Sequence, residues 1–322
     1  MFYQGKVVLV TGGSGFIGSH FVEELLKQGA RVRVTLHERP MSIKDEGIET
    51  VYADLYKIED CLAAVKGVDI VCHAGGGAIG AAVTASNPMS AIAANMITTI
   101  QTLQAAWMAG VERFLLLSSH TTYPNAEYPI KEDEMWSGPT DSSYFGYGWM
   151  RRYLERLAEF VVSKSDMKIA IVRPTAAYGR WDSFDPAKSH VIPALIRRAI
   201  EKEDPFVVWG TGEEVRDFIH ASDIARGGLL ALERNATCDP INIGYGKTVK
   251  IKDIVTMILE AAGHENAKVE FDASKPTTIA FRMVDTSKAK RILDFEPQVS
   301  LEEGLRDTVD WYTQIGAKNP YS

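Results

Sequence analysis

The chain has 322 residues, of which 46% are hydrophobic and 24% are charged, and its formal net charge is −7. This length accommodates one large α/β domain and a smaller one. The acidic balance gives no support to nucleic-acid binding, and no apolar run approaches membrane-spanning length. The N-terminus leads directly into a strand, and the three cysteines are odd in number and widely spaced. We therefore expect a cytoplasmic protein with neither a disulfide framework nor a metal site.

The first element is a strand near 6–11 that enters a glycine cluster and continues into an amphipathic helix near 16–28. Glycine has no Cβ, so the backbone can approach a ligand closely. The helix start directs unpaired N–H groups and a positive dipole end at the same space, which suits a pyrophosphate. This strand, turn and helix predict a dinucleotide site. Its candidate residues are Gly12, Gly15, Phe16, Ile17 and Gly18.

Strand-like runs then alternate with helical periods. The strands are expected near 6–11, 31–36, 48–53, 69–73, 112–118 and 168–173. The helices are expected near 16–28, 58–66, 88–109 and 142–164. This alternation predicts an α/β fold with a doubly wound, parallel Rossmann sheet and a ligand at the carboxyl ends of its strands.

Beyond residue 174 the segments are shorter and are interrupted by prolines. Helices near 190–202, 251–262 and 300–313 are expected to build a smaller C-terminal α/β substrate lobe. The resulting division is a dinucleotide-binding domain over 1–175 with a return segment near 215–245, and a substrate-binding lobe over 176–214 and 246–322.

The end of the second strand bears on the choice of dinucleotide. An NAD site usually has an acidic residue there to accept from the ribose 2′-hydroxyl. Here Leu36 is followed by His37, Glu38 and Arg39, and a cation at this point can meet a 2′-phosphate. The pattern favours NADP(H), while Glu38 leaves NAD(H) open.

Two later strand ends carry further candidate cofactor residues. Asp54, beside Leu55, can accept from an adenine amino group, although an aspartate here can equally serve a turn or a helix start. His73, Ala74 and Gly75 open a second glycine cluster, which predicts backbone close to a cofactor.

The fifth strand opens into Ser118-Ser119-His120-Thr121, and a long helix later carries Tyr147 and Arg151 four residues apart on one face. At these residues the chain resembles the extended short-chain dehydrogenase/reductase family, whose members modify nucleotide sugars. The family has a Gly-x-x-Gly-x-x-Gly loop, a Ser or Thr after the fifth strand and a Tyr-x-x-x-Lys helix. The resemblance implies that Tyr147 exchanges a proton with a sugar oxygen that Ser119 holds. It also implies cofactor roles for Pro174 and Thr175, which begin a turn beside the nicotinamide, and Asn95 is a further cofactor candidate.

One catalytic position departs from that family, because Arg151 stands where a lysine is expected. Arginine keeps the positive charge and can bond ribose hydroxyls, but it does not readily release a proton. We expect tyrosine activation to be retained and a proton relay through this side chain to be lost. The alternative interpretation is a helix-surface ion pair between Arg151 and Glu155.

In the second half of the chain, three segments resemble the GDP-L-fucose synthase branch of the family: Ser189–Leu195, Val208–Gly212 and Arg216–His220. The resemblance implies that His190 is an acid in catalysis. It implies that the nucleotide diphosphate and base contact Arg198, Trp209, Arg216 and Lys275. Without the resemblance, the simpler interpretation is that Arg198 lies on the polar face of a helix and Trp209 lies in the hydrophobic core.

Thr121 is a second departure, because that branch has a cysteine base there. A threonine hydroxyl is a poor base for a proton alpha to a ketone, so double epimerisation is not expected. His120 and Thr121 also replace the Asp-Glu pair of the 4,6-dehydratases, which disfavours that reaction.

The leading hypothesis is a nucleotide-sugar oxidoreductase that reduces a 4-keto hexose with NADPH. The alternatives are a 4-epimerase with a retained NAD, and a cofactor-binding sensor or scaffold with weakened catalysis. Helices near 88–109 and 142–164 resemble those that form a four-helix dimer interface in this family, so a homodimer is expected.

Overall fold

A computed structural model describes residues 1–77, 87–275 and 279–315. Seven strands form one all-parallel sheet in the order β11-β6-β5-β4-β1-β2-β3. Their bounds are β1 (Val7–Thr11), β2 (Arg31–Leu36), β3 (Ile48–Tyr52), β4 (Ile70–His73), β5 (Arg113–Leu117), β6 (Lys168–Pro174) and β11 (Ile241–Ile243). The predicted fold class is confirmed, and each of the six predicted strands is correct to within one residue.

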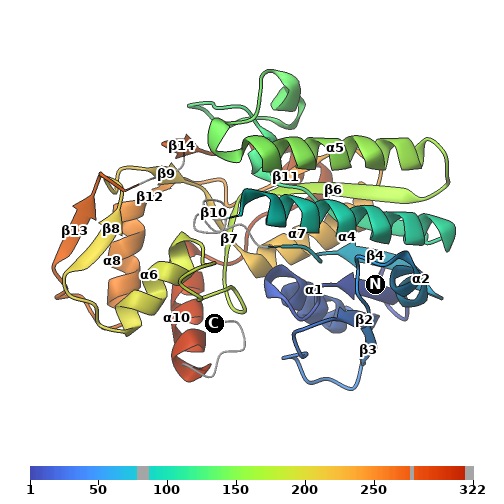
Figure 1. The fold of residues 1–322 in the computed structure, drawn as a ribbon, viewed down its shortest axis with the longest axis horizontal. Coiled ribbons are helices and arrows are strands. Elements are labelled where there is room, and N and C mark those ends of the chain that lie inside the picture. The colour runs from blue at the N-terminus through green and yellow to red at the C-terminus, as the bar shows by residue number, and fades with distance from the viewer. Residues whose placement is uncertain (78–86, 276–278, 316–322) are drawn as a thin grey trace.

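Helices cover both faces of this sheet (Figure 1). One layer consists of α2 (Ile58–Val65), α4 (Pro88–Met108) and α5 (Phe145–Val162). The other consists of α1 (Phe16–Lys27), α7 (Ala221–Arg234) and α9 (Ser287–Leu293). Along β1, Val8 and Val10 belong to the core under α1 and α7, whereas Leu9 belongs to the core under α4 and α5. This alternation is what a parallel strand buried on both faces requires.

A smaller lobe lies beside the carboxyl edge of the sheet, at the left of Figure 1. Its helices are α6 (Val191–Ile200), α8 (Ile251–Ala261) and α10 (Leu301–Ile315). Its strands are β8 (Phe206–Trp209) paired with β13 (Val269–Asp272), and β9 (Val215–Arg216) between β12 (Val249–Lys250) and β14 (Phe281–Arg282). The three helices share a third hydrophobic core with β8, β12 and β13. Two further strands, β7 (Ala176–Tyr178) and β10 (Phe218–His220), pair in parallel where the chain passes between the two lobes.

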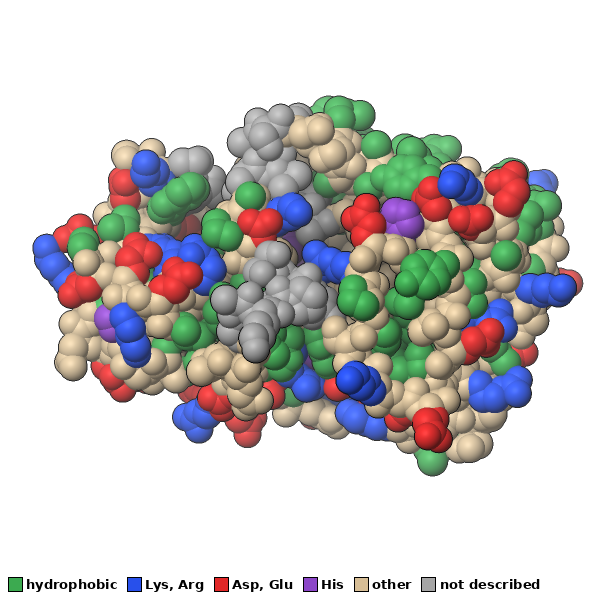
Figure 2. All heavy atoms as spheres, turned by 60° about the horizontal axis from the view of Figure 1, so that its bottom comes forward, with side chains coloured by type: hydrophobic (Ala, Val, Ile, Leu, Met, Phe, Trp, Pro, Cys, Tyr) green, Lys and Arg blue, Asp and Glu red, His purple; other side chains and the backbone are tan. Residues whose placement is uncertain are grey.

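The segment expected to return to the large domain contributes α7 and β11, which the sequence did not resolve as separate elements. The helix α9, from the segment assigned to the small lobe, packs against both of them. Among the described residues, no helix combines the length and apolarity needed to cross a membrane. Acidic and basic side chains are intermixed on the face shown in Figure 2.

Candidate active site

The two glycine clusters touch each other at the carboxyl ends of β1 and β4. Gly12 has a φ of +66°, and a Cβ built on it would lie 2.8 Å from the Ala74 carbonyl oxygen and from the Gly75 Cα. A Cβ on Gly18 would overlap the Gly12 carbonyl oxygen. Gly18 therefore lets α1 abut its own preceding loop.

The start of α1 offers a site for an anion. Its N-cap residue is Gly15, which provides no side-chain cap, and its first turn has no acidic residue. The Ser19 hydroxyl donates to the carbonyl oxygens of Gly13 and Gly15, which fixes the loop without using its N–H groups. The leading N–H groups of a helix have no intrahelical partner, and this end carries the positive dipole. The glycine cradle and uncapped helix start therefore fit the pyrophosphate of a dinucleotide.

The candidate adenosine residues lie at neighbouring strand ends. Leu36 is buried at the end of β2, and His37 and Arg39 are exposed beyond it. Asp54 follows β3 and accepts from the backbone N–H of Tyr56 at 3.1 Å. That hydrogen bond is the largest cause of the lowered pKa of Asp54. The turn interpretation of Asp54 is thus present in the structure, and its contact with adenine remains a prediction.

His73 is enclosed between strands and helix. Its Nδ1 lies 2.8 Å from the Thr11 hydroxyl and its Nε2 lies 3.0 Å from the Thr99 hydroxyl. Burial, together with the nearby Arg151, lowers the pKa of His73 to about 3, so the ring is neutral. The Thr11 hydroxyl also accepts from the backbone N–H of Gly75 at 3.1 Å. His73 therefore connects β4 to β1 and α4, with both ring nitrogens already used.

Ser119 follows β5 and has its hydroxyl oriented by its neighbour Thr121. The Ser119 oxygen accepts from the backbone N–H of Thr121 at 3.2 Å and from the Thr121 hydroxyl at 3.0 Å. Both contacts bring donors to Ser119, so its own O–H remains to donate to another oxygen. Thr121 is buried and its hydroxyl is directed at Ser119. Thr121 therefore positions the Ser119 hydroxyl.

Tyr147 and Arg151 are in direct contact on α5. The Arg151 Nη2 donates to the Tyr147 hydroxyl oxygen at 2.6 Å and to Asn95 Oδ1 at 2.8 Å, and Nη1 donates to the Leu117 carbonyl oxygen at 2.8 Å. The guanidinium carbon lies 4.9 Å from the Tyr147 ring centroid. The alternative pairing of Arg151 with Glu155 is wrong, because Glu155 bonds to other groups. Asn95, proposed from the sequence as a cofactor residue, holds the arginine.

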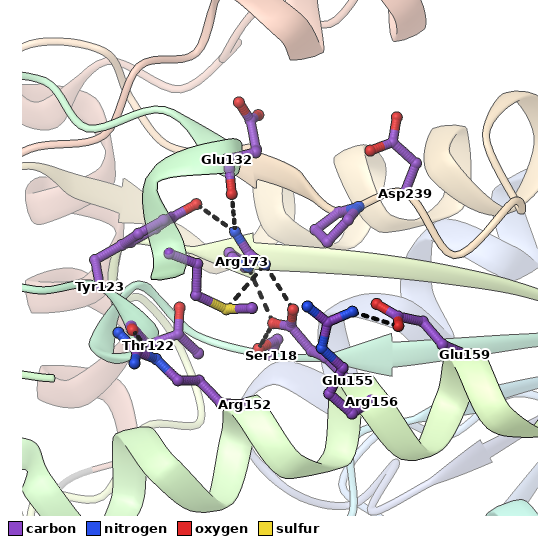
Figure 3. Close-up of polar contacts among 12 residues, drawn as sticks. Ser118, Thr122, Tyr123, Glu132, Arg152, Glu155, Arg156, Glu159, Arg173 and Asp239 are labelled. Carbon is purple, nitrogen blue, oxygen red and sulfur yellow. Dashed lines mark hydrogen bonds and ion pairs between the residues drawn. The ribbon is translucent and has the colours of Figure 1, made fainter. Parts of the chain in front are cut away.

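Figure 3 shows a buried polar network around Glu155 and Arg173 that the sequence analysis missed. Glu155 Oε2 accepts from Arg173 Nη2 at 2.6 Å, Oε1 accepts from Arg173 Nε at 3.0 Å, and the Ser118 hydroxyl also donates to Oε1. Arg173 Nη1 donates to the Tyr123 hydroxyl at 2.8 Å. The side chains of Glu155 and Arg173 are 2% and 1% exposed. The spacing of Glu155, four residues after Arg151, was the available signal for its inward face.

The predicted substrate residues lie in the small lobe and differ in what surrounds them. Trp209 is 53% exposed at the end of β8, so the core interpretation is wrong for it. Lys275 is exposed, and Arg216 is half-buried in β9. Arg198 donates through Nε and Nη2 to the Glu203 carboxylate, each at 2.6 Å, which ties it to its own lobe. His190 is at the N-cap of α6, with Nδ1 3.5 Å from Asp182 Oδ1.

Comparison with known proteins identifies the family of this chain. The model described as the NAD dependent epimerase/dehydratase family matches residues 8–244. The chain belongs to this family. It is 31% identical to a probable GDP-L-fucose synthase 1 of Oryza sativa subsp. japonica, covering 98% of this chain and 95% of that one. It is 28% identical to a dTDP-4-dehydro-6-deoxy-D-allose reductase of Streptomyces bikiniensis, covering 96% and 97%.

A solved UDP-glucose 4-epimerase of Thermotoga maritima, with UDP-glucose, superposes with a TM-score of 0.83 at 25% identity, covering 96% of this chain and 99% of that one. The chain is an NAD(P)-dependent nucleotide-sugar epimerase/reductase of the extended short-chain dehydrogenase/reductase type.

Proposed function

We propose that the protein is an oxidoreductase acting at carbon 4 of the hexose of a nucleotide sugar, and that it reduces a 4-keto sugar. The observation that carries this proposal is the contact between Arg151 and the Tyr147 hydroxyl, on the helix beside the oriented Ser119. A proton donor, an oxygen-binding hydroxyl and a fixed cation are the three groups that carbonyl reduction requires of a protein.

Each residue has a defined task in this reaction. The Ser119 O–H donates to the oxygen on carbon 4, and Tyr147 gives that oxygen its proton. Arg151 stabilises the phenolate that Tyr147 becomes, through the Nη2 bond of 2.6 Å. A bound nicotinamide dinucleotide would supply the hydride for carbon 4. Arg151 itself stays protonated, so the proton that restores Tyr147 comes by a path other than through this side chain.

The orientation of Thr121 favours reduction without epimerisation at the neighbouring carbons. Removal of a proton alpha to a ketone needs a base, and the Thr121 hydroxyl is neutral, buried and bonded to Ser119. Among the relatives, the Streptomyces bikiniensis protein is named as a reductase of a 4-dehydro-6-deoxy sugar. Its name supports a reductase interpretation for this chain.

For the cofactor we propose NADP(H) in preference to NAD(H). The end of β2 places an exposed Arg39 beyond the buried Leu36, where a 2′-phosphate would lie. For the substrate we propose that Trp209 stacks on the base and that Arg216 and Lys275 meet the diphosphate. His190 is proposed as an acid facing the sugar. The kcat/KM for NADPH and NADH, compared between the unmodified protein and Arg39→Ala, tests the cofactor preference.

The activity test uses Tyr147→Phe against 4-keto-6-deoxy dTDP- and GDP-sugars, UDP-hexoses, and UDP- and GDP-linked hexuronates. Loss of the proton donor should lower kcat by about 10²–10⁴-fold. Tyr153→Phe removes the same hydroxyl from an exposed position on the same helix and should leave kcat unchanged. One NADPH consumed per sugar supports reduction, and conversion without net change in nicotinamide absorbance supports the 4-epimerase. Tight cofactor binding without turnover of any of these sugars would support the sensor or scaffold instead.

A further inference from the structure

Arg282 is a buried cation to which neither the family pattern nor the proposed mechanism gives a task. It ends β14 and is only 4% exposed. Its Nη1 donates to the Pro124 carbonyl oxygen at 2.9 Å, whereas Nε and Nη2 have no hydrogen-bond partner. A buried polar group without a partner costs free energy, so this arrangement calls for a physical explanation.

The two unpartnered nitrogens form the edge of a guanidinium that binds a carboxylate with two parallel hydrogen bonds. The same protein shows this use twice. Arg198 holds Glu203 through Nε and Nη2, and Arg173 holds Glu155 through the same two atoms. Within the described part of the chain, Nε and Nη2 of Arg282 have no carboxylate as a hydrogen-bond partner, and Asp141 acts on Arg282 only through its charge.

The surroundings of Arg282 belong to the part of the site that holds carbon 4. Pro124 lies five residues beyond Ser119, and the charge of Arg282 helps to lower the pKa of His120, the neighbour of Ser119. Burial lowers the pKa of Arg282, and Tyr144, three residues before Tyr147, lies close enough to oppose that shift. Arg282 therefore lies beside the segments that carry both catalytic hydroxyls.

Arg216 stands next to Arg282 in the parallel pairing of β9 with β14, and paired residues of adjacent strands face the same side. The proposed role of Arg216 is to meet the diphosphate, which is attached at carbon 1. In a hexose, carbon 1 lies across the ring from carbon 4, whereas carbon 6 is two bonds from carbon 4. An anion that reaches Arg282 beside Ser119 is therefore expected at carbon 6.

We propose that Arg282 binds a carboxylate at carbon 6 of the sugar, so that the substrate is a nucleotide-linked hexuronate. The inference rests on the proposed function, because it assumes that a nucleotide sugar is held with carbon 4 at Ser119 and Tyr147. It assigns Arg282 to substrate selection, leaving Ser119 and Tyr147 to perform the reaction.

The test is calorimetric binding to the Tyr147→Phe protein, which prevents turnover. The probes are UDP, UDP-glucose and UDP-glucuronic acid, with GDP, GDP-mannose and GDP-mannuronic acid as the second set. The uronate should bind at least tenfold more tightly than the neutral hexose of its set, a difference of about 1.4 kcal/mol. Equal affinities would overturn the inference, and this measurement needs no change at Arg282.

Adding Arg282→Lys keeps the charge and removes the two-bond edge, so the preference for the uronate should fall below threefold. The affinity for UDP and GDP should stay within threefold. Arg197→Lys is the matched control, because Arg197 lies in the same lobe and pairs with the exposed Glu201. It should leave all of these affinities unchanged. If Arg282→Lys weakens the free nucleotides as much as the sugars, the anion is the diphosphate and the inference is wrong. If none of the six probes binds, the inference is overturned, and the turnover test, which also includes dTDP-sugars, decides the proposed function separately.

Discussion

Arg151 holds three groups from three parts of the fold: a hydroxyl on its own helix, the carbonyl oxygen at the end of β5, and the amide of Asn95 on α4. A lysine ammonium is a compact donor, whereas the guanidinium is a wide fork that can reach all three at once. Arg151 thus combines support of Tyr147 with the joining of α4, α5 and β5.

This double role predicts how substitutions at Arg151 behave. Arg151→Lys keeps the charge near Tyr147 and should retain cofactor affinity within about tenfold, or 1.4 kcal/mol. Arg151→Ala removes the hydrogen bonds to the Leu117 carbonyl oxygen and to Asn95 Oδ1, which should cost about 1–3 kcal/mol of stability and also lower kcat. Cofactor titration and urea unfolding of both variants check this. Unchanged affinity, rate and stability in Arg151→Ala would contradict both roles.

Short motifs were enough to propose the candidate catalytic residues, whereas their hydrogen-bond partners could not be predicted. The spacing of Tyr147 and Arg151 places them on one helical face whatever the rest of the chain does. That Thr121 points at Ser119, or that Arg198 closes on Glu203, depends on how segments meet in three dimensions. His73 illustrates the same limit, because its position at a strand end indicated a ligand while its two threonine partners lie 62 and 26 residues away.

At the scale of elements, the pair of Glu155 and Arg173 joins α5 to β6 (Figure 3). The Ser118 hydroxyl adds the end of β5 to the same carboxylate. The network therefore fixes Ser119, which follows Ser118, relative to the helix that carries Tyr147.

Breaking this pair should destabilise the protein far more than breaking an exposed pair on the same helix. Glu155→Gln leaves the Arg173 charge buried and uncompensated, which should cost about 3–5 kcal/mol. Arg156→Gln breaks the pair with Glu159, whose side chains are 51% and 43% exposed, and should cost about 0–1 kcal/mol. Urea unfolding of both variants measures the difference. Equal losses would show that burial of the pair does not govern its contribution.

The elements that the sequence predicted well are those whose residues share one kind of surroundings along the whole element. Strands buried on both faces are continuous apolar runs, so β1 and β5 were located to within one residue. The helix α7 was not resolved because it contains Gly227 and Gly228, which a pattern reads as interruptions. In the fold these glycines allow close packing, since a Cβ on Gly228 would lie 2.8 Å from the ring of Phe21.

For the molecule as a whole, buried neutral histidines link stability to pH. Burial lowers the pKa of His73 and of His120 to about 3, and also lowers those of His20 and His220. An unfolded histidine titrates near 6.5, so the unfolded state binds more protons below that pH. The stability contributed by these groups is complete above about pH 6.5 and is lost as the pH falls. Burial raises the pKa of Asp217 to about 6, which opposes this trend between about pH 4 and 6.

The unfolding free energy should therefore fall by at least about 2 kcal/mol between pH 7.5 and 5.5, because each buried histidine contributes up to about 1.4 kcal/mol per pH unit. His73→Asn should reduce this pH dependence by about 1.4 kcal/mol. His37→Asn should leave it unchanged, because His37 is exposed. Urea unfolding at the two pH values measures the effect, and a stability that is flat over this interval would count against it.

We propose that the expected homodimer forms through α4 and α5. The neighbouring helices α4 and α5 expose Met89, Ile97 and Met108 on the first, and Tyr153 and Phe160 on the second, at 37–63%. Tyr153 and Phe160 are seven residues apart and so share one face of α5. Apolar side chains gathered on two adjacent helices are typical of an interface, and a second copy of the chain would bury both helices in a two-fold bundle.

Charge placed on this surface should separate the subunits. The double variant Tyr153→Asp/Phe160→Asp puts two carboxylates where the partner would pack, and should weaken the dimer by more than about a hundredfold, or 2.7 kcal/mol. Tyr52→Asp introduces the same charge at a residue that is 79% exposed on β3, away from both helices, and should leave the dimer intact. Sedimentation velocity over a range of concentrations distinguishes the two variants. If the unmodified protein sediments as a monomer, the expected dimer is wrong. If the dimer survives the double change, its interface lies elsewhere.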